Sequence, residues 1–162
     1  MYAFSTLAAQ LKGQPVTLAD PEQSIVHLSL DTRQLKNGSA TLFQAIKGAQ
    51  ADGHANLQEA YQRGCRSFIV EEDPTQFLGE TALTQTNMLR VDHTVTALQT
   101  LAAYHRQQFT LPVIGITGSN GKTVVKEWLY QLLYQDYRIV KSPRSYNSQI
   151  GVPLSVWQIR PE

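Results

Sequence analysis

The chain has 162 residues, enough for one domain or for a small domain and part of another, and 42% of them are hydrophobic against 17% charged. This balance is typical of a packed globular core and argues against intrinsic disorder. The formal net charge of +1 produces no overall field that would attract nucleic acid or an anionic membrane, so any anion site must be local. No apolar run approaches the ~20 residues that span a bilayer, and no signal-peptide pattern opens the chain. We therefore expect a cytoplasmic protein without membrane insertion and without a nucleic-acid partner.

The first 110 residues predict helices that alternate with strands. An apolar face over residues 4–12, followed by Gly13, predicts a short helix, and alternating polarity over 24–30 predicts a strand. The further predicted elements are strands over 41–46, 66–71 and 88–91, helices over 55–63 and from about 92 to 109, and a polar loop with a short helical turn over 74–86. This alternation indicates an α/β domain.

Two isolated residues in this region carry little functional signal. His27 lies on the polar side of a predicted strand, with no second metal-binding residue type at a useful spacing. Cys65 is the single cysteine, which excludes an intrachain disulfide and fits a reducing compartment. We expect Cys65 to be a small buried apolar residue.

A second domain is predicted to begin at residue 111, where the sequence around Pro112 interrupts the helical pattern. The predicted elements after this boundary are strands over 113–117 and 137–140 and a helix over 122–134. A single strand–helix–strand unit cannot cover both faces of a parallel sheet. We therefore expect residues 111–162 to be the incomplete start of an ATP-binding domain with a parallel sheet.

The most specific motif, T-G-S-N-G-K-T over residues 117–123, lies between the predicted strand and helix. Gly118 and Gly121 allow a tight turn that points successive N–H groups at one anion, and the helix N-terminus adds further donors. Lys122 would contact the outer phosphates, and the Thr123 hydroxyl would bind Mg²⁺. The predicted ATP-binding residues are Thr117, Gly118, Ser119, Asn120, Gly121, Lys122 and Thr123. The alternative is a turn that merely joins a strand to a helix.

The loop departs from the usual phosphate loop at Ile116, where a glycine is expected, which disfavours a kinase or GTPase. It resembles instead the ATP loop of the Mur ligases and their folylpolyglutamate synthase relatives. Its continuation, V-V-K-E over 124–127, resembles the MurF-type ligases of that family.

Further motifs resemble the amino-terminal domain of the same family, which binds the UDP end of the sugar-nucleotide substrate. These are D-T-R over 31–33, L-F-x-A over 42–45 and G-x-x-x-D-G-H over 48–54, with Thr32 in place of the usual serine. The resemblance implies substrate-binding roles for Ser29, Asp31, Thr32, Arg33, Gly48, Asp52, Gly53 and His54. The chemistry is suitable, because Arg33 can pair with phosphate and the hydroxyls of Ser29 and Thr32 can reach a base edge. The alternative is an Asp31–Arg33 ion pair beside a turn, followed by a second turn that caps a helix.

A third segment, around I-G-V-P over residues 150–153, resembles the N-x-x-I-G-V-P segment of Mur ligases. The resemblance implies that Asn147 faces the γ-phosphate and the reacting end of the substrate, so that Lys122 and Asn147 are the predicted catalytic residues. The alternative is a polar loop before a helix that contains Val156 and Trp157. The motifs follow one another in the family's order and cover nearly the whole chain.

The resemblance implies an ATP-dependent acid–amino-acid ligase of peptidoglycan synthesis, and hence a role in cell wall biogenesis, cell shape and cell division. Such an enzyme activates UDP-N-acetylmuramoyl-tripeptide as an acyl phosphate and joins it to D-alanyl-D-alanine, with ATP and Mg²⁺. We expect the remaining Mg²⁺ ligands to lie beyond residue 162 and this chain alone to be inactive. The sequence of residues 122–128 and 145–158 resembles that of ligases fused ahead of an alanine racemase. Pyridoxal phosphate would belong only to that downstream domain. The alternatives are another Mur- or folylpolyglutamate-type ligase and a non-catalytic UDP-sugar-binding module.

Overall fold

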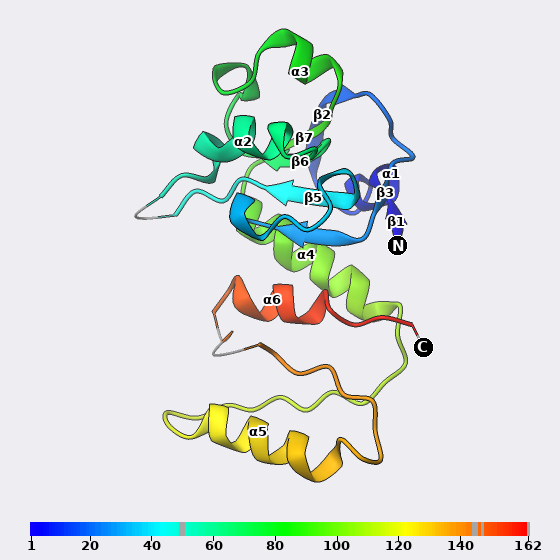
Figure 1. Cartoon of the computed structure of the whole chain (residues 1–162), viewed down its shortest axis with the longest axis vertical. Helices are drawn as coiled ribbons and strands as arrows, with labels where there is room; N and C mark the ends of the chain where they lie inside the picture. Colours follow the sequence, from blue (N-terminus) through cyan, green and yellow to red (C-terminus); the bar gives the residue numbers. More distant parts are fainter. Residues whose placement is uncertain (49–50, 144–145, 147, 162) are drawn as a thin grey trace. The chain divides into compact units, whose positions relative to one another are not determined.

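The computed structural model describes residues 1–48, 51–143, 146 and 148–161. The chain forms two compact units, Met1–Leu101 and Ala102–Glu162 (Figure 1). No helix among the described residues is long and apolar enough to cross a membrane. The two units divide between Leu101 and Ala102, inside the helix Thr94–Gln107. The domain boundary expected at residue 111 stays a prediction.

The first unit is built on a five-stranded sheet with the order β2-β7-β6-β5-β4. Its strands are β2 (Gly13–Leu18), β4 (His27–Ser29), β5 (Thr41–Gln44), β6 (Ser67–Val70) and β7 (Asn87–Val91). Strands β4 to β7 pair in parallel, whereas β2 pairs with β7 in antiparallel orientation at the edge. A separate two-stranded sheet joins β1 (Tyr2–Ala3) to β3 (Ser24–Ile25). The predicted α/β architecture is confirmed.

Helices cover both faces of this sheet. The α-helices of the first unit are α1 (Phe4–Ala8), α2 (Leu57–Gln62), α3 (Glu80–Thr84) and α4 (Thr94–Gln107), which continues into the second unit. Short 3₁₀ helices are η1 (Thr32–Gln34), η2 (Gly38–Ala40), η3 (Gly53–Asn56) and η4 (Pro74–Gln76). Figure 1 shows α2 and α3 on one side of the sheet and α4 on the other. Strands covered on both faces carry continuous apolar runs, which is why β6 reads as Ser-Phe-Ile-Val and is buried throughout.

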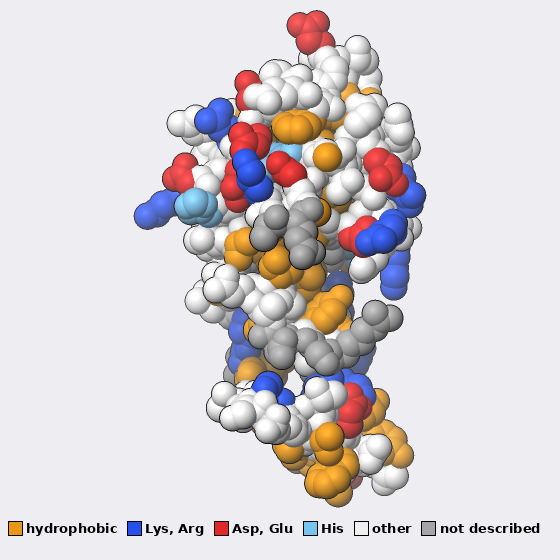
Figure 2. Space-filling model, turned by 90° about the vertical axis from the view of Figure 1, so that its left-hand side faces the viewer, with side chains coloured by type: hydrophobic (Ala, Val, Ile, Leu, Met, Phe, Trp, Pro, Cys, Tyr) orange, Lys and Arg blue, Asp and Glu red, His pale blue; other side chains and the backbone are white. Residues whose placement is uncertain are grey.

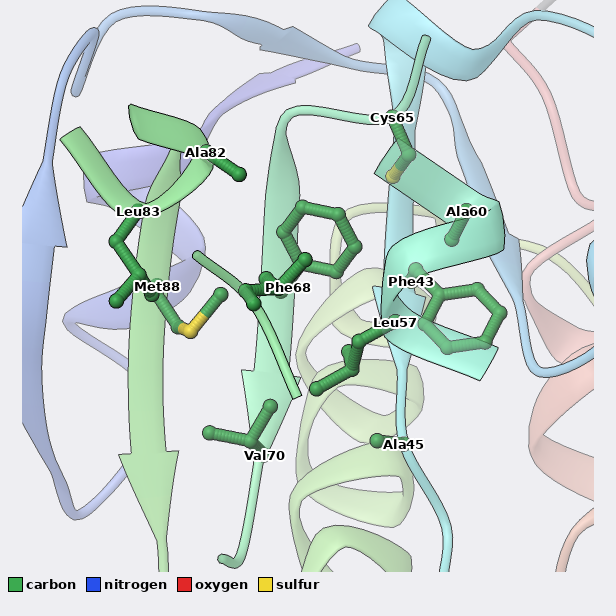
Figure 3. Close-up of a cluster of buried hydrophobic side chains, with 11 residues drawn as sticks. Phe43, Ala45, Leu57, Ala60, Cys65, Phe68, Val70, Ala82, Leu83 and Met88 are labelled. Atoms are coloured by element: carbon green, nitrogen blue, oxygen red, sulfur yellow. The ribbon is translucent and has the colours of Figure 1, made fainter. Parts of the chain in front are cut away.

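The core on the α2 and α3 side gathers side chains from strands and helices (Figure 3). Phe43 of β5 and Phe68 of β6 meet edge to face with ring centroids 6.2 Å apart, and Met88 of β7 is buried in the same cluster. Leu57 and Ala60 supply the contact from α2. This core fixes the positions of the ends of the parallel strands, from which the site loops emerge.

The sequence prediction around residue 13 was wrong in one respect. Helix α1 ends at Ala8, and Gly13 begins β2 instead of following a helix end. A Cβ at Gly13 would lie 2.8 Å from the Arg90 carbonyl oxygen, so the glycine permits the close approach of β2 to β7. Pro15, which disfavours a central strand, is tolerated here because β2 lies at the sheet edge, and it hid the strand from sequence analysis.

The second unit contains α5 (Lys122–Leu133) and α6 (Gly151–Val156) after the end of α4. The strands predicted over 113–117 and 137–140 are not formed, because neither segment has a paired neighbour among the described residues. Val113 and Ile114 are accordingly 64% and 63% exposed. Helix α5 buries none of its residues. Several of its hydrophobic side chains are exposed, and Figure 2 shows hydrophobic atoms at the surface of the unit that contains this helix. The hydrophobic face of α5 is therefore not covered by any of the described residues.

Candidate functional site

The amino-terminal motifs meet at one edge of the parallel sheet. Strands β4, β5 and β6 are parallel, so the turns that follow them emerge at the same carboxyl-terminal edge. The turn after β4 carries residues 31–33, the turn after β5 carries 45–48 and 51–54, and the turn after β6 carries 71–72. Ligands of open α/β sheets bind at such edges. The topology therefore brings together the residues that the sequence assigns to substrate binding.

The turn after β4 is organised by Asp31. Its carboxylate accepts a hydrogen bond from the Arg33 backbone N–H at 3.0 Å, which caps η1, and also binds the Arg33 guanidinium through Nε at 2.9 Å and Nη2 at 2.8 Å. The guanidinium hydrogen bond is the main reason that the pKa of Asp31 falls to about 2. The Ser29 hydroxyl donates to the Asp31 carbonyl at 3.0 Å. The ion pair considered as the alternative is thus present, yet the Arg33 side chain remains 83% exposed and within reach of an anion.

Thr32 is directed away from solvent. Its buried hydroxyl donates to Glu59 Oε2 on α2 at 2.9 Å, and its carbonyl accepts from Arg63 Nη1 at 3.2 Å. Glu59 and Arg63 form an ion pair at 2.8 Å. In this structure the Thr32 hydroxyl therefore anchors the turn to α2, a role that a serine at the same position would share.

The turn after β5 requires glycine and is capped by Asp52. A Cβ at Gly53 would lie 2.7 Å from the Ile46 backbone nitrogen, so no other residue fits without a shift of the chain. The Gly48 N–H donates to the Ala51 carbonyl at 2.9 Å, which closes the turn. Asp52 accepts the His54 backbone N–H at 2.9 Å and caps η3.

His54 is fully buried beneath this turn. Its Nδ1 lies 2.6 Å from Asp52 Oδ1, and its Nε2 lies 3.0 and 3.2 Å from the backbone nitrogens of Glu71 and Glu72. Burial alone would raise the pKa of Asp52, but the hydrogen bonds from His54 outweigh it and lower the pKa. At the surface Lys47 and Glu72 form an ion pair at 2.7 Å. Sequence analysis missed Glu71 and Glu72, because no local pattern links them to His54, which lies 17 and 18 residues earlier.

The predicted ATP loop has the backbone geometry expected of a phosphate-binding turn. Gly118 and Gly121 adopt φ values of 144° and 78°, which favour glycine, and Gly121 is the N-cap of α5. The Val125 N–H donates to the Gly121 carbonyl at 2.9 Å, so the N–H groups of residues 122–124 open the first turn and have no intrahelical acceptor. The Lys122 ammonium donates to the Gly118 carbonyl across the loop. These features fit an anion site.

The other residues assigned to this loop lie on the surface. Thr117, Ser119, Asn120 and Thr123 are exposed. The Thr123 hydroxyl offers one oxygen ligand, the kind that Mg²⁺ accepts beside nucleotide phosphates. Across the described residues no group of three or more His, Cys, Asp or Glu could hold a metal ion. Asn147, the second predicted catalytic residue, lies outside the described residues.

Ion pairs connect α5 to the chain that follows it. Lys126 Nζ donates to the Ser142 carbonyl at 2.9 Å, and Glu127 pairs with Lys141. The Lys141 hydrogen bond is the main cause of the lowered pKa of Glu127. The Lys141 ammonium also lies 3.9 Å from the centroid of the Tyr130 ring. Lys126 and Glu127 of the V-V-K-E sequence thus hold residues 141 and 142 against α5.

Comparison with known proteins identifies this architecture. Residues 116–162 match the model of the Mur ligase middle domain. The chain is similar to Mur ligases.

Among these ligases the chain is similar to those of the MurF type. It is 37% identical over 147 residues to the UDP-N-acetylmuramoyl-tripeptide–D-alanyl-D-alanine ligase of Synechocystis sp., covering 91% of this chain and 31% of the relative. The crystal structure of MurF from Acinetobacter baumannii matches with a TM-score of 0.83 at 28% identity, over 98% of this chain and 33% of that one. MurF from Thermotoga maritima in complex with ADP matches with a TM-score of 0.68 at 29% identity, over 86% and 30%. The chain thus spans about a third of the length of these relatives.

Proposed function

We propose that this chain forms the sugar-nucleotide- and ATP-binding part of a ligase that adds D-alanyl-D-alanine to UDP-N-acetylmuramoyl-tripeptide in peptidoglycan synthesis. The observation that carries the proposal is the glycine loop at the start of α5, with positive φ at Gly118 and Gly121 and Lys122 folded across it. The similarity to MurF-type ligases over more than nine-tenths of the chain supports the substrate assignment.

The loop would bind the phosphates of ATP. Backbone N–H groups at the start of α5 and the Lys122 ammonium face charge that builds on the transferring phosphoryl group, and such fixed donors stabilise the transition state. Mg²⁺, held by the Thr123 hydroxyl and the phosphates, would neutralise part of this charge. Transfer to the substrate carboxylate gives an acyl phosphate, and the amine of D-alanyl-D-alanine then displaces phosphate to form an amide. Asn147 would orient the substrate end beside the loop.

The edge of the sheet in the first unit would bind the uridine diphosphate part of the substrate. The exposed Arg33 guanidinium is the cation suited to the diphosphate, and its position is fixed by two hydrogen bonds to Asp31. Ser29, Asp52 and the backbone around Gly48 and Gly53 line the neighbouring turns. An arginine that is already oriented loses little side-chain entropy on binding.

Several finer predictions belong to the same proposal. These are the cytoplasmic location, the role in cell division and cell shape, and the inactivity of this chain alone in ligation. The alanine racemase fusion, with its pyridoxal phosphate, also stays a prediction from the wording of the sequence. A purified 162-residue chain that hydrolysed ATP only when both tripeptide substrate and D-alanyl-D-alanine were present would contradict the predicted inactivity.

Calorimetric titration of the chain tests the proposal, with UDP-N-acetylmuramoyl-tripeptide, UDP and ATP·Mg²⁺ run separately. Arg33→Ala should weaken uridine-nucleotide binding by about tenfold or more and leave ATP unchanged, because it removes charge-assisted hydrogen bonds. Lys122→Ala should weaken ATP binding and leave uridine-nucleotide binding unchanged. Arg90→Ala and Lys12→Ala, which remove exposed charges outside the motifs, are the matched controls. A folded chain that bound neither nucleotide would contradict the proposal.

A further inference from the structure

We propose that His54 is a positioning residue for the uridine-nucleotide site and acts through Asp52 and the turn after β6 without contacting the ligand. The inference rests on the proposed function, since it concerns the same edge of the sheet. It differs from the role that the family resemblance implies for His54, which is direct substrate binding.

The burial of His54 leaves no route for direct contact. The side chain has no exposed surface, and its ring lies 5.6 Å from the ring of Phe77, measured between centroids. Both ring nitrogens are already within hydrogen-bond distance of protein atoms. A nucleotide that bound at the surface would therefore meet the residues around His54 and not the imidazole itself.

The contacts also fix the tautomer of the ring. Backbone N–H groups can only donate, so Nε2, which lies 3.0 and 3.2 Å from the nitrogens of Glu71 and Glu72, must be unprotonated. The proton of the neutral ring is then on Nδ1 and is donated to Asp52 Oδ1 at 2.6 Å. A proton on Nε2 would bring three N–H groups together, so the arrangement requires this one tautomer.

His54 thereby joins elements that are distant in sequence. On one side it orients Asp52 in the turn after β5, and on the other it holds the backbone at residues 71–72 after β6. Glu71 in turn accepts from the N–H of Thr94 at 2.6 Å and from its hydroxyl at 2.8 Å, at the start of α4. One imidazole therefore connects both turns and, through Glu71, a helix N-terminus at the edge where the ligand site is proposed.

Asp52 is the group through which His54 would affect the ligand. The carboxylate side chain is 36% exposed, and both hydrogen bonds from His54 are received by Oδ1. Among the described residues Oδ2 has no hydrogen-bond donor, so it can accept a hydroxyl or N–H group of a nucleoside. Since the carboxylate is held at one oxygen by two donors, the direction of the other oxygen is set before the ligand arrives.

Two substitutions separate the two halves of this role. The amide oxygen of His54→Gln can take the place of Nε2 and accept from the backbone of residues 71–72. The shorter His54→Asn can keep a donor near Nδ1 for Asp52 but has no atom that reaches that backbone. We expect His54→Gln, which leaves Asp52 without its side-chain donor, to weaken UDP binding by about tenfold. His54→Asn should speed amide hydrogen exchange at Glu71 and Glu72 and should weaken UDP binding less than His54→Gln does.

Ring ¹⁵N NMR of the unsubstituted chain tests the positioning role without any variant. His54, assigned by the signal that His54→Gln lacks, should show Nδ1 protonated and Nε2 unprotonated, and the pattern should persist at saturating UDP. A proton on Nε2, or a ring signal that changes as for a direct ligand contact, would overturn the inference. So would a folded His54→Gln that binds UDP as well as the unsubstituted chain, or a folded His54→Asn that binds UDP more weakly than His54→Gln.

The outcome for the proposed function can be read separately. If the unsubstituted chain bound no uridine nucleotide, the proposed function would fail, and with it the link from His54 to a ligand. The tautomer and the amide exchange at residues 71–72 would still show whether His54 holds the two turns. Binding by the unsubstituted chain together with unaffected variants would instead refute only the role of His54.

Discussion

Gln44 is a buried amide whose replacement should stabilise the first unit. The side chain, at the end of β5, has no exposed surface, and among the described residues neither Nε2 nor Oε1 has a hydrogen-bond partner. Gln44 pairs in register with Ile69 of β6, and Leu42, two residues earlier, lies on the same face of the strand. The surroundings suit an apolar side chain, so we select Gln44→Leu.

The size of the effect follows from the two amide atoms. A buried polar group without a partner destabilises a protein by roughly 1–3 kcal/mol. Leucine is similar in size to glutamine but branched, and an imperfect fit could remove about 1 kcal/mol of the gain. We therefore expect Gln44→Leu to increase the free energy of unfolding by about 1–3 kcal/mol if leucine packs well, and by about 0–2 kcal/mol if it does not. For a unit of about 100 residues each kcal/mol raises the melting temperature by about 4–8 °C.

Asn87 provides the matched control, because it is a buried amide on β7, another parallel strand of the same sheet, with its hydrogen bonds satisfied. Its Oδ1 accepts the Asp20 N–H at 2.8 Å, and its Nδ2 donates to the Asp20 carbonyl at 2.6 Å and to Gln23 Oε1 at 3.1 Å. Asn87→Leu leaves these partners without the amide and should destabilise by about 1–3 kcal/mol or more. The same change of chemistry is thus expected to have opposite signs at the two positions.

The assay must report on the first unit alone. Both tryptophans, Trp128 and Trp157, lie in the second unit, so fluorescence would follow the wrong part of the chain. Urea unfolding should instead be followed by hydrogen exchange of the β5 and β6 amides, which belong to the first unit. If Gln44→Leu destabilised these strands as much as Asn87→Leu does, the Gln44 amide would have to be hydrogen-bonded in the folded protein, and the reasoning would be refuted.

Three further predictions concern packing and ionisation. Gly53→Ala should destabilise the first unit by about 1–3 kcal/mol, because the new Cβ would lie 2.7 Å from a backbone nitrogen, whereas Gly79→Ala, with nothing within 4 Å, should be nearly neutral in thermal unfolding. Burial raises the pKa of the Cys65 thiol to about 11, so a thiol reagent at about pH 8 should label it only after unfolding, and rapid labelling of the native chain would contradict this. Burial also lowers the pKa of His105 below 6.5, so its contribution to stability is complete above that value and declines as the pH falls below it. The ring centroid of Trp157 lies 4.6 Å from that of His105, so acidification in this range should change the fluorescence of Trp157. The measurement uses a Trp128→Phe background, and adding His105→Gln should abolish the change.

The elements best predicted from sequence are those whose pattern is set by burial on both faces. Strands β5, β6 and β7 each contain two or three adjacent apolar residues, and the structure buries almost every residue in them, polar ones included. Strand β2 was missed because it contains Pro15, and because its place at the edge leaves Val16 and Leu18 exposed. An edge strand needs neither a continuous nor a clearly alternating apolar pattern, so its sequence gives little signal.

The site divides in the same way between local and distant contacts. The caps formed by Asp31 and Asp52 join residues two positions apart, and turn chemistry predicts them directly. The contact from Thr32 to Glu59 spans 27 residues and exists only because the sheet and α2 bring the two together. Short motifs therefore predict which turns form the candidate site but not which side chains are already bonded within the protein.

In the second unit the predicted ATP loop forms, whereas the strand predicted just before it does not. A strand is completed by a neighbour, and the run of β-branched residues over 113–117 reports a preference for burial that no described segment satisfies. The loop depends on no such neighbour. Its shape comes from positive φ at Gly118 and Gly121 and from the first hydrogen bond of α5, all of which lie within the motif and its helix. The turn can therefore form where the adjoining strand does not. If the turn binds phosphate as proposed, its glycines are the part of the motif whose substitution should disturb that binding through the backbone alone.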